Sequence, residues 1–161
     1  MHSFIATIIA AAHIAAVVIG SVPFIRQETN FCGPAALTSV MSYYGDVIDQ
    51  HEIAEVIYNE KLKGCIIADL ENYARLKGYA TKAGQGSVDL VLDFLNDRKP
   101  VIVLVDLGRW VISRPHYLVI VGYNEDGFIA HSGHEASQFY EFDRFKKIWK
   151  KIGSTYLVVY R

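Results

Sequence analysis

PVIVLVDL at residues 100–107 and HYLVIVGY at residues 116–123 are almost entirely apolar runs, rich in β-branched and aromatic residues. Such runs are typical of central strands that are buried on both faces of a sheet. Three shorter runs predict further strands: GFIAHSG at 127–133, QFYEF at 138–142 and STYLVVY at 154–160. The chain after Pro100 is therefore expected to form a β-sheet.

The chain before Pro100 has the residue spacing of helices. In the segment 69–77, Leu70, Tyr73 and Lys77 recur at helical intervals, and Gly78 follows as a terminator. The same spacing predicts further helices over residues 32–44, 49–58 and 87–95, and an amphipathic helix over residues 143–151. We expect an α+β fold in which N-terminal helices pack on a C-terminal antiparallel sheet.

Composition excludes several classes of protein. The 161 residues are 52% hydrophobic and carry 16 Lys and Arg against 17 Asp and Glu, a formal net charge of −1. A disordered chain would be less apolar, and a nucleic-acid-binding protein would need a positive field. Two cysteines cannot form a disulfide framework. A peptide or protein is the natural partner of such a chain, and nucleic acid is not expected.

The positive mean hydropathy, +0.19, comes largely from the N-terminus. No Asp, Glu, Lys or Arg precedes Arg26, and residues 4–19 read FIATIIAAAHIAAVVI. A run of this length and composition predicts a signal peptide or membrane anchor over residues 1–21, with a buried core helix as the alternative. The domain then covers residues 22–161, and the protein is expected to be exported, periplasmic or extracellular, or membrane-anchored.

Cys32 stands in the first turn of a predicted helix, directly before Gly33 and Pro34. Unpaired N–H groups and the positive end of the helix dipole favour a thiolate at that position. The alternative for any single cysteine is a small buried hydrophobic residue. The position of Cys32 therefore makes it a candidate nucleophile.

Two other residues have the chemistry to assist a thiol. Gln27 lies five positions before Cys32, so a loop can bring its side-chain NH₂ and the backbone N–H of Cys32 to one point, as in an oxyanion hole. His116 begins an apolar strand directly after Pro115, where a general base can be presented. Each signal is weak alone, and a surface or core histidine is the alternative for His116.

Together, the segments VPFIRQETNFCGPAAL at 22–37 and PHYLVIVGYNEDGFIAHSG at 115–133 resemble the family thirty-nine cysteine peptidases. That family has a papain-like fold and includes bacterial bacteriocin-processing peptidase domains. The resemblance implies that Cys32 is the nucleophile, His116 the base and Gln27 the oxyanion residue. It covers residues 22–161 and suggests a stand-alone form without an ATP-binding cassette.

One position departs from the family pattern. The family usually places an Asp or Asn at the end of the strand after the His hairpin, where it orients the imidazole. Here His131 or Ser132 stands at that place, and either is a weaker partner for an imidazolium than a carboxylate. Asn124 and Asp126 are expected to form a turn instead.

The remaining polar residues predict no cofactor or metal. Cys65 begins an apolar patch and is expected to be a core thiol. The histidines near Cys32 in the predicted fold match no zinc-ligand spacing. Gly84-Gln85-Gly86 lacks the Lys-Ser/Thr of a phosphate-binding loop.

These observations predict a cysteine peptidase that hydrolyses a peptide bond. The resemblance further implies processing of a leader peptide of the double-glycine type. The alternative is a catalytically weak or inactive peptidase-like module that binds peptides at the membrane. The atypical residue behind His116 favours this alternative, whereas the joint presence of Cys32, His116 and Gln27 favours the enzyme.

Overall fold

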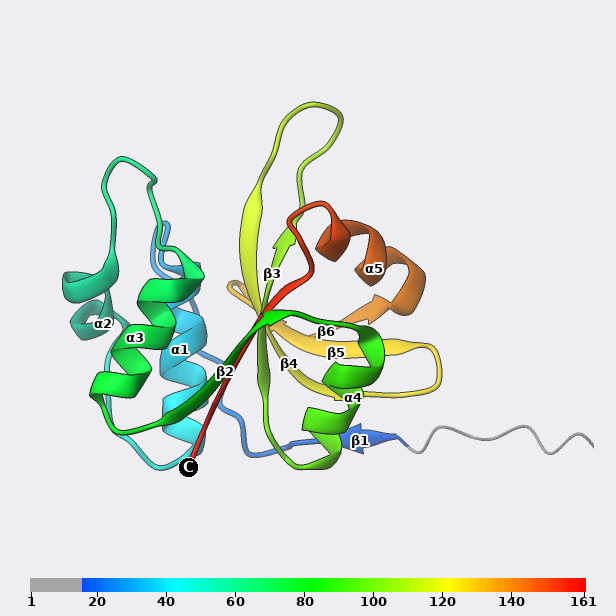
Figure 1. The fold of residues 1–161 in the computed structure, drawn as a ribbon, viewed down its shortest axis with the longest axis horizontal. Helices are drawn as coiled ribbons and strands as arrows, with labels where there is room; N and C mark the ends of the chain where they lie inside the picture. The colour runs from blue at the N-terminus through cyan, green and yellow to red at the C-terminus, as the bar shows by residue number, and fades with distance from the viewer. Residues whose placement is uncertain (1–15) are drawn as a thin grey trace, which may run out of the picture.

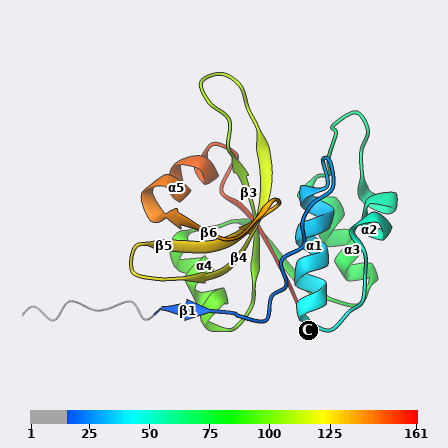
Figure 2. The same cartoon turned by 180° about the vertical axis from the view of Figure 1, so that it is seen from behind.

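A computed structural model describes residues 16–161 and shows a central antiparallel sheet between two groups of helices (Figure 1). Helices α1 to α3 cover one side of the sheet, and α4 and α5 lie on the other, as the view from behind also shows (Figure 2). The helices are α1 Cys32–Tyr43, α2 Gln50–Ile57, α3 Ile67–Leu76, α4 Val88–Asn96 and α5 Phe142–Lys150. The predicted α+β fold is confirmed.

The sheet has the strand order β2-β7-β3-β4-β5-β6, and β1 pairs with β4 outside this path. Its strands are β1 Val17–Val18, β2 Ala80–Gln85, β3 Val101–Asp106, β4 Pro115–Tyr123, β5 Gly127–Ser132, β6 Glu135–Glu141 and β7 Thr155–Tyr160. The predicted central strands β3 and β4 are buried along most of their length. His116 near the start of β4 pairs with Val105 of β3, and the pairing of β4 with β5 begins at Val119.

Strand β2 was not predicted from the sequence. Its residues, ATKAGQ, are mostly exposed and lack the β-branched pattern of the other strands. It forms because it pairs in register with β7, from Ala80 opposite Tyr160 to Gln85 opposite Thr155. Tertiary pairing therefore overrides a weak local preference here.

The predicted amphipathic helix near the C-terminus is confirmed as α5. Phe145 and Trp149 on its inner face are fully or almost fully buried. They pack with Phe128 of β5 in a row of aromatic contacts, with Phe145 in contact with both of the others. This helix covers the sheet next to the β3–β4 loop, since Lys151 at its end donates a hydrogen bond to the carbonyl of Gly108.

Part of the apolar N-terminal segment belongs to the sheet. Val17 and Val18 pair with Tyr123 and Gly122 of β4, and the N–H of Ile19 donates to the carbonyl of Val121. Ile19 is buried in the core. Residues 1–15 of the predicted signal peptide or anchor lie outside the described residues. Within residues 16–161, no helix is long and apolar enough to cross a membrane.

The β3–β4 loop projects from one end of the sheet (Figure 1). Asp106 holds its base, because its carboxylate accepts hydrogen bonds from the backbone N–H groups of Gly108 and Arg114 and from the hydroxyl of Ser113. Trp110 at the tip is 99% exposed and so does not cover the core. The loop therefore has a base that is anchored by hydrogen bonds and a tip that is apolar and exposed. It leads through Pro115 to His116.

Candidate active site

Helix α1 begins at Cys32, so the thiol stands at a helix N-terminus as predicted. The preceding residue, Phe31, provides no side-chain cap, which leaves backbone N–H groups of the first turn available. The backbone N–H groups of Tyr117, Gly33 and Cys32 itself act to lower the pKa of the Cys32 thiol. Burial acts more strongly, however, and the pKa of Cys32 is raised above its usual value.

His116 opens β4 and is half-buried. Its Nε2 lies 3.3 Å from the hydroxyl oxygen of Ser132. Burial, aided by the positive charge of Arg114 and by His134, lowers the pKa of His116 to about 4. The imidazole is therefore neutral at neutral pH, and its Nδ1 is the ring nitrogen that Ser132 leaves free.

The thiol of Cys32 and the imidazole of His116 are related through the residue next to His116. Cys32 lies beside the backbone N–H of Tyr117, which directly follows His116. Among the described residues no hydrogen bond joins the Cys32 sulfur to the His116 ring itself. Catalytic hydrogen bonds are often long in an empty site and shorten when substrate binds. The thiol therefore lies beside the backbone of the residue that directly follows His116.

Ser132 at the end of β5 is one member of a chain of polar groups. Its hydroxyl acts to lower the pKa of the Tyr140 phenol, although burial raises that pKa overall. The Tyr140 hydroxyl in turn donates a 2.7 Å hydrogen bond to Oε1 of Gln138. A series of neutral groups therefore stands behind the imidazole, at the place where a carboxylate was expected from the family pattern.

His131, the neighbour of Ser132, serves a different part of the molecule. Its Nδ1 accepts a 3.1 Å hydrogen bond from the backbone N–H of Ser137, so its Nε2 carries the proton and donates to the carbonyl of Val22 at 3.0 Å. The ring is buried and makes an edge contact with Phe24. His131 thus ties the N-terminal segment to β5, and of the two candidates only Ser132 contacts His116.

Gln27 lies in the loop before α1 and is attached to the turn after β5. Its N–H donates a 2.8 Å hydrogen bond to the carbonyl of Gly133, and its side chain lies directly over the Gly133 Cα. Gly133 has a φ of +42°, and a Cβ at this position would collide with the Gln27 carboxamide. Ser132 and Gly133 therefore bring the imidazole and the carboxamide to adjacent residues of one turn.

Gln50 is a residue of this site that sequence reasoning missed. Its Nε2 donates to the carbonyl of Arg26 at 2.9 Å, and its Oε1 accepts from the N–H of Glu28 at 3.0 Å. The buried carboxamide therefore holds the backbone on both sides of Gln27. No local pattern could have revealed it, because a glutamine in the first turn of α2 is ordinarily a surface residue.

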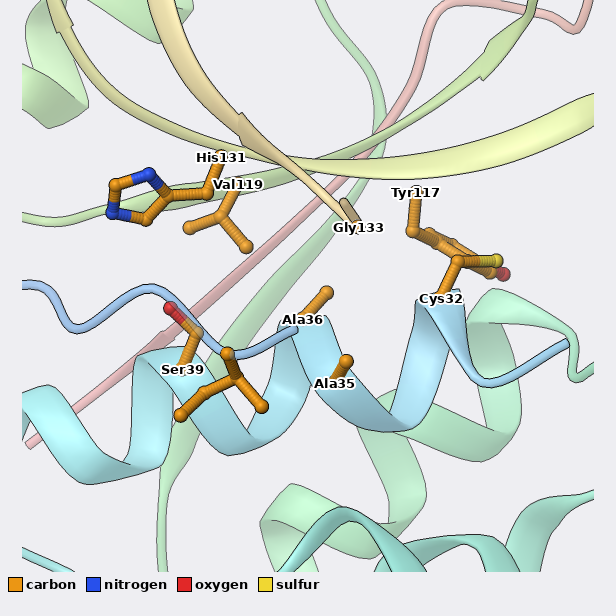
Figure 3. Close-up of a pocket in the computed structure, with 9 residues that line it drawn as sticks. Cys32, Ala35, Ala36, Ser39, Tyr117, Val119, His131 and Gly133 are labelled. Carbon is orange, nitrogen blue, oxygen red and sulfur yellow. The ribbon is translucent and has the colours of Figure 1, made fainter. Parts of the chain in front are cut away.

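A narrow crevice runs from Cys32 between α1 and the sheet (Figure 3). Its volume is about 10 Å³, which leaves space for roughly one water molecule. Its walls are small residues of α1 and inward-facing residues of the sheet: Ala35, Ala36 and Ser39 from α1, with Tyr117, Val119, His131 and Gly133. The crevice is therefore a small gap in the packing between α1 and the sheet, too small for a substrate residue.

Cys65 packs against the first turn of α1. Its sulfur occupies the space that a side chain on Gly33 would need, and its carbonyl accepts a 3.1 Å hydrogen bond from the hydroxyl of Tyr117. Burial, with smaller effects from Cys32 and Asp69, raises the pKa of Cys65 to about 12. Cys65 is therefore a protonated thiol at neutral pH that shapes the wall behind the nucleophile.

Comparison with protein families gives one match. A family model described as the Peptidase_C39 like family matches residues 19–157 of the chain. No curated protein matches it. The matched residues include all five candidate site residues, so the match and the geometry concern the same part of the molecule.

Several crystal structures have the same fold. A C39-like peptidase from Bacillus anthracis has a TM-score of 0.74 at 15% identity, covering 91% of this chain and 98% of that one. The peptidase domain of Streptococcus ComA, a bi-functional ABC transporter involved in quorum sensing, has a TM-score of 0.73 at 23% identity and covers 86% and 98%. A double glycine motif protease from an AMS/PCAT transporter, in complex with the leader peptide, has a TM-score of 0.66 at 17% identity and covers 90% and 97%. The predicted papain-like fold is confirmed.

Proposed function

The chain belongs to the C39-like peptidase family, and on this premise we propose that it hydrolyses a peptide bond with Cys32 as nucleophile and His116 as base. The observation that carries the proposal is the convergence of three segments at one end of the sheet. Cys32 lies beside the backbone of Tyr117, His116 contacts Ser132, and Gln27 lies on Gly133.

The first chemical step forms an acyl-enzyme. Nδ1 of His116 accepts the thiol proton as the Cys32 sulfur attacks the peptide carbonyl, and the carbonyl electron pair moves to the oxygen. The backbone N–H of Cys32 and the side-chain NH₂ of Gln27 donate to that oxygen. His116 then gives its proton to the peptide nitrogen, the C–N bond breaks, and a thioester remains on Cys32.

The second step releases the acyl product. Nδ1 of His116 takes a proton from a water molecule whose oxygen attacks the thioester carbonyl. When the C–S bond breaks, the proton returns to the Cys32 sulfur and the product leaves as a carboxylic acid, which ionises in water. Every proton is accounted for by His116, Cys32 and water.

The resting pair is neutral in this scheme. The pKa of Cys32 is raised and that of His116 is about 4, so thiol and imidazole coexist at neutral pH instead of a thiolate and an imidazolium. Proton transfer then accompanies the attack. Because Nδ1 must be free, Nε2 carries a proton and donates it to the Ser132 oxygen, which orients the ring without adding negative charge.

The substrate we propose is a peptide with small residues at the cleavage site, such as a double-glycine leader. The small residues around the thiol, Ala35 and Ala36 of α1 and Gly133 after β5, are consistent with this. The double glycine motif protease among the similar structures is consistent with it.

We also propose that the N-terminal segment directs the protein to or across a membrane. The support is the charge-free apolar run over residues 4–19. Because Ile19 is buried and β1 pairs with β4, a cleavage before residue 17 would leave the sheet complete. Fractionation of cells, with mass spectrometry of the mature N-terminus, measures both the location and any cleavage.

An electrophilic epoxide of the kind that labels papain-like peptidases tests the catalytic proposal. We expect labelling of Cys32, found by peptide mass spectrometry, at a rate at least tenfold higher than in His116→Ala. Cys65→Ser is the matched control and should be labelled at the same rate as the unmodified protein. Equal labelling of Cys32 with and without His116 would contradict the proposal.

The peptide-binding module is the second candidate, and the neutral partner behind His116 is the observation that favours it. It predicts that a double-glycine leader peptide binds with micromolar affinity, measured by fluorescence anisotropy, and remains uncleaved after prolonged incubation. Appearance of the two expected fragments by mass spectrometry, and their absence with Cys32→Ala, would exclude this candidate.

A further inference from the structure

A second cleft, of about 310 Å³, is lined in part by His116 and shares no residue with the crevice beside α1. His116 and Ser132 form its inner end. The other walls come from the β3–β4 loop, the turn between β5 and β6, the strand β6 and the first turns of α5. The cleft is therefore joined to the candidate active site at His116 and Ser132 and shares no lining residue with the crevice.

Three arginines line this cleft: Arg109 and Arg114 from the loop and Arg144 from α5. Glu135 is the one acidic residue in the lining. None of the three arginines forms an ion pair within residues 16–161, although all are exposed and able to do so. The cleft therefore has an excess of positive charge that the protein does not neutralise.

The arginines are carried by well-held parts of the structure. Asp106 uses its carboxylate to fix the base of the β3–β4 loop, including the backbone N–H of Arg114. The Arg144 guanidinium lies 5.7 Å from the centre of the Tyr140 ring. Such preorganisation reduces the entropy lost when an arginine binds a carboxylate.

The position of the cleft relative to His116 sets which part of a substrate it receives. After attack, the acyl part stays on the Cys32 sulfur, whereas the leaving nitrogen takes its proton from His116. The chain that continues from this nitrogen must pass His116 on the side away from the thiol. His116 lines the cleft and Cys32 does not, so we place the segment after the cleaved bond in this cleft.

We propose that this cleft, which we call the arginine cleft, binds acidic side chains in the segment that follows the cleaved bond. The proposal rests on the proposed function and names part of its substrate class. A carboxylate accepts two parallel, charge-assisted hydrogen bonds from an arginine guanidinium. Basic or neutral side chains cannot form this bidentate ion pair. The enzyme would then select substrates from both sides, by small residues before the bond and acidic residues after it.

Matched peptides test this preference. Two peptides should differ only in Asp or Asn at the second and third positions after the cleaved bond. We expect kcat/KM to be about tenfold higher for the Asp peptide at low salt, and the ratio to approach one near 1 M salt, where screening is strong. In Arg109→Gln/Arg144→Gln the Asp-to-Asn ratio should fall to about one, and Arg109→Lys/Arg144→Lys should recover part of it.

Lys61→Gln is the control, because it removes an exposed positive charge from the loop between α2 and α3. It should leave the Asp-to-Asn ratio as in the unmodified protein. A ratio of one in the unmodified protein, or an equal fall in the ratio with Lys61→Gln, would overturn the proposal and leave the peptidase function standing.

A binding measurement separates the two proposals. A fluorescent peptide that begins with the acidic segment represents the leaving product and needs no catalysis. With Cys32→Ala in the full chain, we expect this peptide to bind about tenfold more tightly than its Asn analogue, and the difference to disappear in Arg109→Gln/Arg144→Gln. That result, together with no cleavage of any peptide by the unmodified protein, would uphold the arginine cleft and reject the peptidase, whereas equal binding of both peptides would reject the cleft.

Discussion

The two halves of the candidate active site are built in different ways. Gln27 and Cys32 are five residues apart in one loop and helix start, and Gln50 holds that loop from the neighbouring helix. His116 and Ser132 lie 16 residues apart on two strands, and the strand pairing alone brings them within 3.3 Å. Nearness in sequence therefore brings Gln27 and Cys32 together, with Gln50 and Gly133 holding their loop, whereas register alone sets the imidazole half.

Strand β5 shows what this difference means. Successive residues of a strand point to opposite faces, so a shift of one residue would exchange the places of His131 and Ser132. In the observed register Ser132 contacts His116 and His131 ties down the N-terminal segment. The four predictions below test the two halves separately.

The largest effect is expected in the thiol half. Gln27→Ala removes a side-chain donor to the oxyanion and should lower kcat by about 10²–10³-fold, measured by steady-state hydrolysis of a peptide. Gly133→Ala should also lower kcat, because the added Cβ would displace the Gln27 carboxamide.

Gly153→Ala controls for backbone strain in that experiment. Gly153 also has a positive φ, +79°, but a Cβ there would have its nearest neighbour at 3.7 Å. Both glycine variants should lose stability, and only Gly133→Ala should lose kcat. An equal kcat for the two would remove Gln27 from the proposed oxyanion hole.

The next effect concerns stability at His131, the neighbour of Ser132 in β5. His131→Leu leaves the carbonyl of Val22 and the N–H of Ser137 without their buried partner, so the free energy of unfolding should fall by about 1–3 kcal/mol. Denaturant unfolding measures this loss. A large fall in kcat at temperatures where the variant is fully folded would instead place His131 in the chemistry.

A smaller effect is expected for Gln50, acting through Gln27. Gln50→Leu removes the hydrogen bonds that hold the backbone at Arg26 and Glu28. It should lower kcat about tenfold with little change in KM, because tenfold corresponds to the free energy of roughly one hydrogen bond. A double-mutant cycle tests the route. If Gln50→Leu lowers kcat as much in Gln27→Ala as in the unmodified protein, the two residues act independently.

The smallest effect on rate is expected for Ser132. Its neutral hydrogen bond to His116 corresponds to a change of roughly two- to tenfold, so Ser132→Ala should reduce kcat/KM by about that factor. Ser132→Asp adds a negative charge at Nε2, which favours the imidazolium and raises the pKa of His116.

The dependence of kcat/KM on pH measures this rise in the pKa of His116. The pKa of His116 is about 4, so kcat/KM of the unmodified protein should fall only as the pH drops through about 4, where the base becomes protonated. In Ser132→Asp the same fall should occur at a higher pH. An unchanged acid limb would show that Ser132 does not contact the working base.

Much of the thiol half could be predicted because its signals are local. The helix that begins at Cys32, the glycine that follows it at Gly45 and the five-residue distance to Gln27 are all visible in the sequence. Gln50 could not be predicted, because its two hydrogen bonds cross from α2 to a loop more than 20 residues away. Strand β2 was missed for the same reason, since only pairing with β7 stabilises it.

The amino-acid sequence by itself determined the α+β order of elements and the buried strand that contains His116, and it named the candidate residues for peptide hydrolysis. Periodicity, capping and residue type are short-range properties, so they can be read from neighbouring positions. Only the tertiary structure decided between His131 and Ser132, placed beside His116 three arginines that form no ion pair within residues 16–161, and set the burial that lowers the pKa of His116. These depend on register and on desolvation, which arise when distant segments pack together.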